Sequence, residues 1–335
     1  MLQFYVYELF FIKWFKKGGF VGIYTMRTMR TMRTMSTIKA VKQNYTYVLK
    51  SIKKDRSLAP RVEWLKNKTY IVSGGTRGIG FNIAKKLALQ GANVTIVGKT
   101  QQKHPKLEWT IFSAAETICD MVKKPTCMGI PCDVRFPEQI DNAIRETEDV
   151  FGPIHGVVLN ASALCLNPTL KQTEKEVELM SSVNINGTFL FGQKCLKAMT
   201  GGHMLIIAPP MTMLDNDDWW VPHLYYSMSK FNMTLMAKYW NKEFPDVAVN
   251  TLWPRTTIDT APVRNLLGGD EMVNISRTPD VMGDAAKHIL MSDPLVCQGK
   301  NWIDDEVLAS LDVDVEQYRV NRNISEKDLM PDFFC

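Results

Sequence analysis

Short apolar runs and helical stretches alternate along most of the chain. Apolar, β-rich runs bounded by glycine, proline or polar residues predict buried strands. The runs cover residues 69–73, 93–98, 128–134, 154–160, 203–208 and 247–253, with 300–305 as a candidate edge strand. Residues 79–91 carry apolar positions at helical spacing and end at a glycine, which predicts a helix after the first run. The alternation predicts right-handed βαβ units and a parallel sheet covered on both faces.

The pattern therefore predicts an α/β fold with a doubly wound parallel sheet of the Rossmann type, in a single domain from about residue 66 to residue 335. We expect residues 1–60 to form an N-terminal extension that is dispensable for folding. Its apolar start spans about a dozen residues, too few for a spanning helix of roughly 20. The basic repeat TMRTMRTMRTM at 25–35 is similar to a mitochondrial presequence, and a disordered leader is the alternative.

Composition and charge narrow the classes of function. Of the 335 residues, 45% are apolar and 22% are charged, which is ordinary for a globular protein. The formal net charge is +5, but residues 1–54 hold eleven Lys or Arg and one acid. The rest of the chain is therefore net acidic, which argues against a basic surface for nucleic-acid binding there. Seven scattered cysteines without a CxxC pair predict free thiols in a reducing compartment. The five histidines lie far apart, so we expect no metal site.

The stretch SGGTRGIG at 73–80 lies between the first strand and the first helix. Gly74, Gly78 and Gly80 permit positive φ and a close approach of the backbone to a pyrophosphate. The N-terminus of the following helix presents free N–H groups and its positive dipole end to the phosphates. Tight turns also use glycine for structural reasons alone, but this position at the start of a βαβ series predicts a dinucleotide site.

The end of the second strand favours NADP(H) over NAD(H). An NAD site usually carries Asp or Glu there, to hold the ribose hydroxyls. This strand ends Gly98-Lys99-Thr100 without a carboxylate, and Arg77 adds a second cation near the expected 2′-phosphate. The alternative is that Lys99 is a solvated loop residue.

Tyr226 and Lys230, in HLYYSMSKF at 223–231, are four residues apart and share one helix face. A free tyrosine has a pKa of about 10, too high for a base near neutral pH, and a nearby ammonium lowers that pKa. We therefore expect Tyr226 to exchange a proton with a substrate oxygen while hydride moves to or from a nicotinamide. Tyr225 is the competitor, but the spacing to Lys230 favours Tyr226. The alternative is an aromatic residue and a cation on a surface turn.

Five motifs in this order resemble the short-chain dehydrogenase/reductase family over about residues 68–305. They are SGGTRGIG, CDV at 132–134, NAS at 160–162, NINGTF at 184–189 and YSMSK at 226–230. The resemblance implies an oxidoreductase with a nicotinamide cofactor.

The resemblance also assigns roles to single residues. Asn184 corresponds to the family's catalytic asparagine, which holds a helix backbone and a water that feeds the lysine; a loop or cap residue is the alternative. Lys230 corresponds to the lysine that contacts the nicotinamide ribose, Asn160 lies beside the ribose, and Asp133 with Val134 lies at the adenine. The full set predicted at the cofactor, from the residues and the resemblance together, is Gly74, Thr76, Arg77, Gly78, Ile79, Gly80, Lys99, Asp133, Val134, Asn160 and Lys230.

The chain departs from the family in HMLIIAPPMTML at 203–214. The family strand usually ends in serines, one of which donates to the substrate carbonyl, whereas Ala208, Pro209 and Pro210 have no hydroxyl. Losing one such donor costs on the order of 10²–10³ in rate. Thr212 is a candidate replacement because it lies close by in sequence. Two functions therefore stay open: an enzyme, and a low-turnover NADP(H)-binding regulatory protein.

Segment 253–279 follows the sixth strand and is the expected lid over the substrate, since ligands bind outside the carboxyl ends of parallel strands. Apolar residues in this segment and in the loop after the fifth strand suggest an apolar substrate, although loop packing explains them equally well. They are Leu266, Leu267, Met272, Trp219 and Trp220.

The leading interpretation is an NADP(H)-dependent oxidoreductase that interconverts a carbonyl and an alcohol on a lipid-like substrate, of steroid or fatty-acyl type. The resemblance is closer to one group within the family, through 99–118, 248–261 and the terminal MPDFFC. It implies a role in lipid metabolism and a peroxisomal location, with the mitochondrion as the alternative from the basic N-terminus. The family also implies dimer or tetramer faces around Asn184 and Tyr226.

Overall fold

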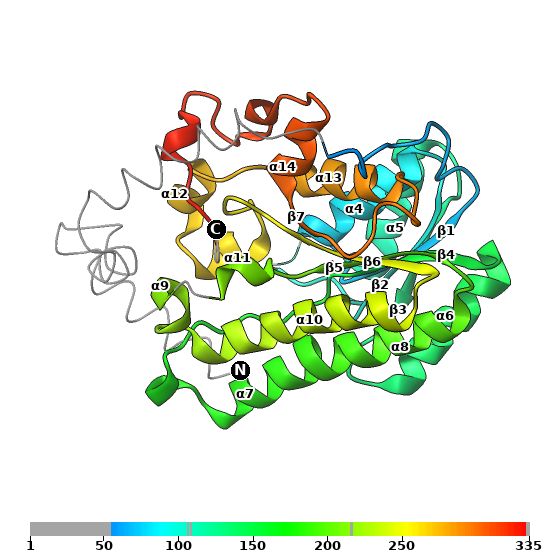
Figure 1. The fold of residues 1–335 in the computed structure, drawn as a ribbon. Helices are drawn as coiled ribbons and strands as arrows, with labels where there is room; N and C mark the ends of the chain where they lie inside the picture. Colours follow the sequence, from blue (N-terminus) through cyan, green and yellow to red (C-terminus); the bar gives the residue numbers. More distant parts are fainter. Residues whose placement is uncertain (1–54, 106, 108, 215–216, 333–335) are drawn as a thin grey trace.

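The computed structural model describes residues 55–105, 107, 109–214 and 217–332, and this part of the chain forms one parallel sheet of seven strands. The strand order is β3-β2-β1-β4-β5-β6-β7 (Figure 1). The strands are β1 Thr69–Ser73, β2 Asn93–Gly98, β3 Cys127–Pro131, β4 Ile154–Leu159, β5 Gly202–Ile207, β6 Val247–Trp253 and β7 Asn301–Ile303. The chain starts in the middle, runs outward through β2 and β3, and then returns to build the other half from β4, so the sheet is doubly wound.

Helices cover both faces of the sheet. Helices α4, α5 and α13 lie on one face, and α6, α8 and α10 lie on the other (Figure 1). The helices are α4 Gly78–Leu89, α5 Ile111–Val122, α6 Pro137–Phe151, α7 Glu174–Met180, α8 Thr188–Ala198, α9 Asp217–Trp220, α10 Leu224–Glu243, α11 Ala261–Leu266, α12 Gly269–Asn274, α13 Asp280–Leu290 and α14 Asp304–Ser310. Short helical segments are η1 Thr169–Lys171, η2 Ser181–Gly187, η3 Met211–Met213, η4 Val315–Tyr318 and η5 Glu326–Asp328. Each layer buries its own apolar cluster against the sheet, as both faces of a parallel sheet require.

The fold class predicted from the sequence is confirmed. Strands β1, β2 and β6 have the predicted bounds, and β7 is the predicted edge strand. Strand β3 ends at Pro131 instead of Val134, because the Asp133 N–H donates to the Gln139 side chain at 2.8 Å and the chain turns into α6. In the described part of the chain, no helix is long and apolar enough to cross a membrane.

The packed region begins before residue 66. Leu58 is 6% exposed and Leu65 is fully buried, and both belong to the apolar cluster under α4 and α13. The Arg61 N–H donates to the Met291 carbonyl at 3.0 Å, which ties this segment to the end of α13. Residues 58–60 are therefore part of the packed domain, although the extension predicted from the sequence includes them. Most of that extension, residues 1–54, lies outside the described residues.

The burial of Leu65 gives a stability prediction. Replacing Leu65 by Ala leaves a cavity in the cluster, and we expect the free energy of unfolding to fall by about 2–5 kcal/mol. Val62 is 89% exposed, so Val62→Ala is the control and is expected to change stability by less than about 0.5 kcal/mol. Denaturant unfolding of both variants measures this, and equal stability of the two would show that this segment does not contribute to the core.

Candidate active site

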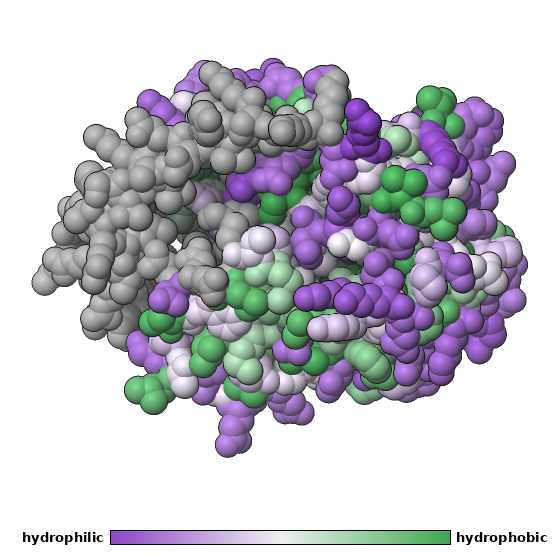
Figure 2. Space-filling view, in the orientation of Figure 1, coloured by the Kyte–Doolittle hydropathy of each residue, from purple (hydrophilic) through white to green (hydrophobic). Residues whose placement is uncertain are grey.

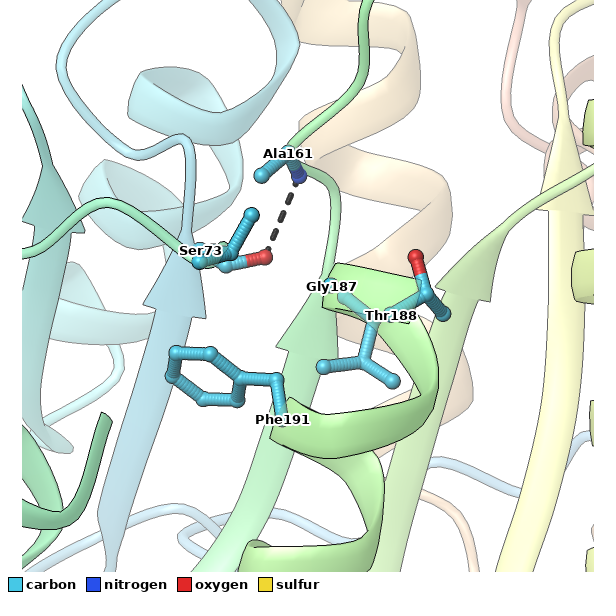
Figure 3. A pocket seen from close by; sticks show the side chains of 7 residues that line it. Ser73, Ala161, Gly187, Thr188 and Phe191 are labelled. Atoms are coloured by element: carbon cyan, nitrogen blue, oxygen red, sulfur yellow. Dashed lines mark hydrogen bonds between the residues drawn. The ribbon is translucent and has the colours of Figure 1, made fainter. Parts of the chain in front are cut away.

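The carboxyl ends of β1 and β4 meet at the switch point of the sheet. The chain leaves β1 toward β2 and leaves β4 toward β5, so the two loops diverge, and such a crevice is where doubly wound sheets bind ligands. Figure 3 shows the hollow there, with Ser73 ending β1, Ala161 following β4, and Gly187, Thr188 and Phe191 coming from η2 and α8. The Ala161 N–H donates to the Ser73 hydroxyl at 3.1 Å, which joins the two loops.

Close backbone packing explains two glycines of the loop after β1. Gly74 has a φ of +65°, which favours glycine. The Asn160 Nδ2 donates to the carbonyls of Ser73 at 3.0 Å and Gly74 at 3.1 Å. A Cβ on Gly80 would lie 2.4 Å from the Gly74 oxygen and 2.5 Å from Asn160 Nδ2. Asn160 thus supports the glycine loop through its side chain, a role that the resemblance did not assign to it.

The remaining loop residues lead into α4. Gly78 has a φ of +57°, and a Cβ there would lie 3.2 Å from Thr260 Cγ2, so the loop faces the segment after β6. Thr76 is buried against Gly98, where a Cβ would meet the Thr76 hydroxyl at 2.5 Å. Ile79 is half-buried in the first turn of α4. The helix therefore begins at the crevice, where its free N–H groups and positive dipole end fit a pyrophosphate.

Arg77 reaches from the glycine loop to the end of β2. Its Nη2 donates to the Thr100 hydroxyl at 3.1 Å and to the Trp109 carbonyl at 3.3 Å. Lys99 follows β2 and is exposed. Residues 98–100 bring no carboxylate to this strand end, so two cations and one hydroxyl gather where the sequence predicted a 2′-phosphate.

Asp133 and Val134 follow β3 on the same edge of the sheet. The Arg135 guanidinium lies 2.6 Å from the Asp133 carboxylate. Hydrogen bonds from Arg135 hold the pKa of Asp133 below its usual range, and the charge of Lys99 adds to the effect. Val134 is buried and lines the hollow of Figure 3. Both predicted adenine-side residues therefore lie at the crevice, and the Asp133 carboxylate is paired with Arg135.

Asn184 is fully buried at the centre of η2, which is a π-helical segment inside one continuous helix from α7 to α8. Its Oδ1 accepts from the Ala163 N–H at 2.7 Å, and its Nδ2 donates to the Ala163 carbonyl at 2.9 Å. The Nδ2 also donates to the Ser229 hydroxyl at 2.9 Å on α10. Asn184 therefore links the loop after β4 to α10, and π-helical segments often mark functional sites.

Tyr226 and Lys230 lie one turn apart on α10, and both are buried. Lys230 Nζ donates to the Ile207 carbonyl at the end of β5 at 2.7 Å and lies 5.2 Å from the centroid of the Trp253 ring at the end of β6. The competing Tyr225 points elsewhere, because its hydroxyl is hydrogen-bonded to Ser181 in η2. The spacing argument for Tyr226 is therefore consistent with the arrangement of α10.

Burial shifts the pKa of both groups toward their uncharged forms. It lowers the pKa of Lys230 to about 7, while the Asp332 carboxylate acts in the opposite direction. It raises the pKa of Tyr226, and Asp332 adds to that rise. The sequence analysis expected Lys230 to lower the pKa of Tyr226. The structure gives the opposite direction, because a buried phenolate would lose its hydration and face the Asp332 carboxylate.

The strand end opposite α10 lacks the family's hydroxyl. Ala208 and Pro209 are buried, and the Pro209 carbonyl accepts from the Thr234 hydroxyl at 2.7 Å. Thr212, the candidate replacement, is exposed in η3. Residues 208–210 therefore place only apolar side chains beside the pair, and Thr212 does not contribute a buried donor.

The segment after β6 forms α11 and α12. Leu266 is 53% exposed at the end of α11, whereas Trp220 stacks on Phe231 with ring centroids 5.1 Å apart and so packs against α10. Sequence reasoning missed Asp332, which lies beside this segment: its N–H donates to the Arg255 carbonyl at 3.0 Å. Asp332 is far from Arg255 in sequence, so no local sequence pattern indicates that the two residues meet.

Comparison with known proteins decides the family. The family model described as short chain dehydrogenase matches residues 68–267. The chain belongs to the short-chain dehydrogenase family. A Xenopus tropicalis relative named hydroxysteroid dehydrogenase-like protein 2 is 38% identical over 83% of this chain. The match spans 66% of that relative, just under two thirds of its length.

Solved structures of short-chain dehydrogenases agree with this assignment. One from Mycobacterium thermoresistibile is 36% identical with a TM-score of 0.71, covering 80% of this chain and 95% of that one. Another, from Burkholderia cenocepacia, was determined in complex with NADP. It is 19% identical with a TM-score of 0.60, covering 71% of this chain and 96% of that one. At this identity the similarity shows a shared fold. Family membership supports an oxidoreductase activity with a nicotinamide cofactor.

The packing of the glycine loop gives a second prediction. A methyl group in Gly80→Ala would displace the loop at a cost of about 1–3 kcal/mol, so we expect the affinity for a nicotinamide cofactor to fall about tenfold or more. Cofactor fluorescence titration measures the affinity. Gly152→Ala is the control. Gly152 has a positive φ, but nothing lies within 4 Å of an added Cβ, so this substitution strains the backbone at a site outside the crevice. A similar loss of affinity in both variants would contradict the assignment of the loop to the cofactor.

Proposed function

We propose that this chain is an NADP(H)-dependent oxidoreductase that reduces the carbonyl of an apolar, lipid-like substrate to an alcohol. The observation that carries the proposal is the convergence of Asn184, Tyr226 and Lys230 on the side of the sheet where the glycine loop opens. Two segments far apart in sequence, η2 and α10, supply these groups. The arrangement matches the order and spacing of the family's motifs.

Tyr226 is the proton donor in this proposal. A tyrosine phenol carries its proton at neutral pH, so Tyr226 can protonate the oxygen of a carbonyl under reduction. A bound nicotinamide would supply the hydride. Lys230 would orient the ribose, and Asn184 would hold the loop after β4 and α10 in register through Ala163 and Ser229.

A matched pair of tyrosine variants tests this role. Tyr226→Phe keeps the ring but removes the acidic hydroxyl, so we expect NADPH oxidation with medium- and long-chain carbonyls to fall about 10²–10⁴-fold. Cofactor affinity should stay nearly unchanged. Tyr225→Phe is the control, because that hydroxyl is bound to Ser181. Equal rates for the parent and Tyr226→Phe would show that Tyr226 is not the acid.

Arg77, Lys99 and Thr100 support NADP(H) over NAD(H). Removing one charge-assisted hydrogen bond costs about 1.5–3 kcal/mol, so Arg77→Ala and Lys99→Ala should each weaken NADPH binding about tenfold or more. NADH binding should be unaffected. Lys103 is an exposed cation in the same loop, and Lys103→Ala should leave both affinities unchanged. Fluorescence titration of both cofactors measures this; tighter binding of NADH by the parent would reverse the preference.

A regulatory protein with little turnover is the second candidate. Ala208 and Pro209 support it, because the position that usually polarises the substrate carbonyl has no hydroxyl. The discriminating outcome is tight NADPH binding by a parent protein that reduces none of the carbonyls offered. Reduction of any of them, lost in Tyr226→Phe, favours the enzyme.

The proposal extends to assembly and location. Figure 2 shows apolar side chains gathered over α10 and α8, and the exposed residues there include Phe189, Met228, Leu235 and Tyr239. We propose this face as the contact of a homo-oligomer, as the family implies. A peroxisomal location, or a mitochondrial one, stays a prediction from the resemblance and the N-terminal sequence.

A further inference from the structure

The expected lid, segment 253–279, is closed at its base. The Arg277 N–H donates to the Thr257 carbonyl at 3.0 Å, and the Asp259 N–H donates to the Arg277 carbonyl at 2.9 Å. Helices α11 and α12 lie between these two stretches. Thr260, which precedes α11, faces the glycine loop, because a Cβ on Gly78 would lie 3.2 Å from its Cγ2. A shift of the base would therefore move both helices relative to the crevice.

The C-terminal segment, residues 315–332, lies beside α11 and α12 and pairs with both edges of this base (Figure 1). On one edge, the Thr278 N–H donates to the Tyr318 carbonyl at 2.7 Å. On the other edge, the Thr257 N–H donates to the Met330 carbonyl at 2.9 Å. The C-terminal segment therefore contacts the stretch that enters α11 and the stretch that follows α12.

A buried arginine joins the lid to the C-terminal segment and to the sheet. Arg277 is fully buried, and its guanidinium lies 2.5 Å from the Glu326 carboxylate and 3.2 Å from the Asp305 carboxylate. Asp305, which follows β7, is also fully buried and lies 3.3 Å from the Arg255 guanidinium. One series of ion pairs thus links both ends of the lid, α14 and the C-terminal segment. Because a buried charge is costly without its partner, losing the Glu326 charge weakens the hold on Arg277.

We propose that Glu326 and Arg277 are positioning residues that hold the lid over the crevice, so that the C-terminal segment sets the affinity for a carbonyl substrate through the lid. A lid that is ordered in advance lowers the entropy cost of substrate binding. The effect on substrate affinity rests on the proposed function, whereas the hold on the lid is a property of the protein alone.

Hydrogen exchange of backbone amides measures the hold on the lid without cofactor or turnover. In the full-length protein, the amides of Thr257, Asp259 and Arg277 report on the base, and those of β1 and β4 report on the whole fold. Glu326→Gln removes the charge and keeps the shape. We expect the base amides to exchange about tenfold faster or more, the effect of losing one charge-assisted hydrogen bond. Exchange in β1 and β4 should stay unchanged.

Glu316→Gln is the matched control. The Glu316 carboxylate lies 2.7 Å from the Arg319 guanidinium in the same segment but is 56% exposed, and exposed ion pairs contribute little to stability. Exchange at the base should therefore stay as in the parent. Glu326→Asp keeps the charge on a shorter side chain and should restore most of the protection. Unchanged exchange in Glu326→Gln, equal acceleration in both Gln variants, or acceleration that extends to β1 and β4 would overturn the proposal.

A second variant covers failure of Glu326→Gln to fold. Arg277→Lys keeps the charge, but a lysine cannot span both carboxylates as the guanidinium does, so the base amides should again exchange faster. Unchanged exchange in Arg277→Lys would then overturn the proposal. Failure of both variants to fold would assign the pair a purely structural role, with the same consequence.

Steady-state kinetics on the same variants separate the lid from the proposed function. In a parent that reduces a carbonyl, Glu326→Gln should raise KM severalfold and leave kcat nearly unchanged, because substrate binding must then order the lid. A fall in kcat at unchanged KM would contradict the positioning role. A parent that reduces no carbonyl, with faster exchange at the base in Glu326→Gln, would refute the proposed enzyme and leave the hold on the lid intact.

Discussion

The site depends on the close approach of two backbones at the ends of β1 and β4. Ser73 and Asn160 join the loops with hydrogen bonds that leave no room for side chains at Gly74 and Gly80. A parallel sheet brings its carboxyl strand ends to one edge, and the reversal of strand order separates the loops there. The cofactor loop, the π-helical segment and the pair on α10 all take their positions from that edge.

The burial of Lys230 is an energetic cost at this edge. A desolvated ammonium needs compensation from hydrogen bonds, from an aromatic face or from an opposite charge. The Ile207 carbonyl and the Trp253 ring supply the first two. The same desolvation raises the pKa of Tyr226, so the exclusion of water from the pair is the largest cause of both pKa shifts.

Local signals predicted the sheet, and they selected candidate residues in the loops after β1, β2, β3 and β4 and on α10. Strand bounds followed from apolar runs such as 247–253, and the glycine loop from its spacing between a strand and a helix. Two features could not be predicted from local patterns. The pKa of Tyr226 depends on burial, which spacing to Lys230 does not report, and the contact of Asp332 with Arg255 joins residues whose proximity only the folded chain creates.

The π-helical segment at Asn184 constrains the number of residues more than their identity. A regular α-helix turns by about 100° at each residue, so removing one residue from η2 would restore a regular ladder but rotate everything before it relative to α8. If the missing residue lies between Asn184 and α8, Asn184 would then point away from Ala163 and Ser229. A single-residue deletion in 185–187 should therefore be more damaging to this protein than most substitutions there, and a gain in helix regularity would accompany the loss of the link between the β4 loop and α10.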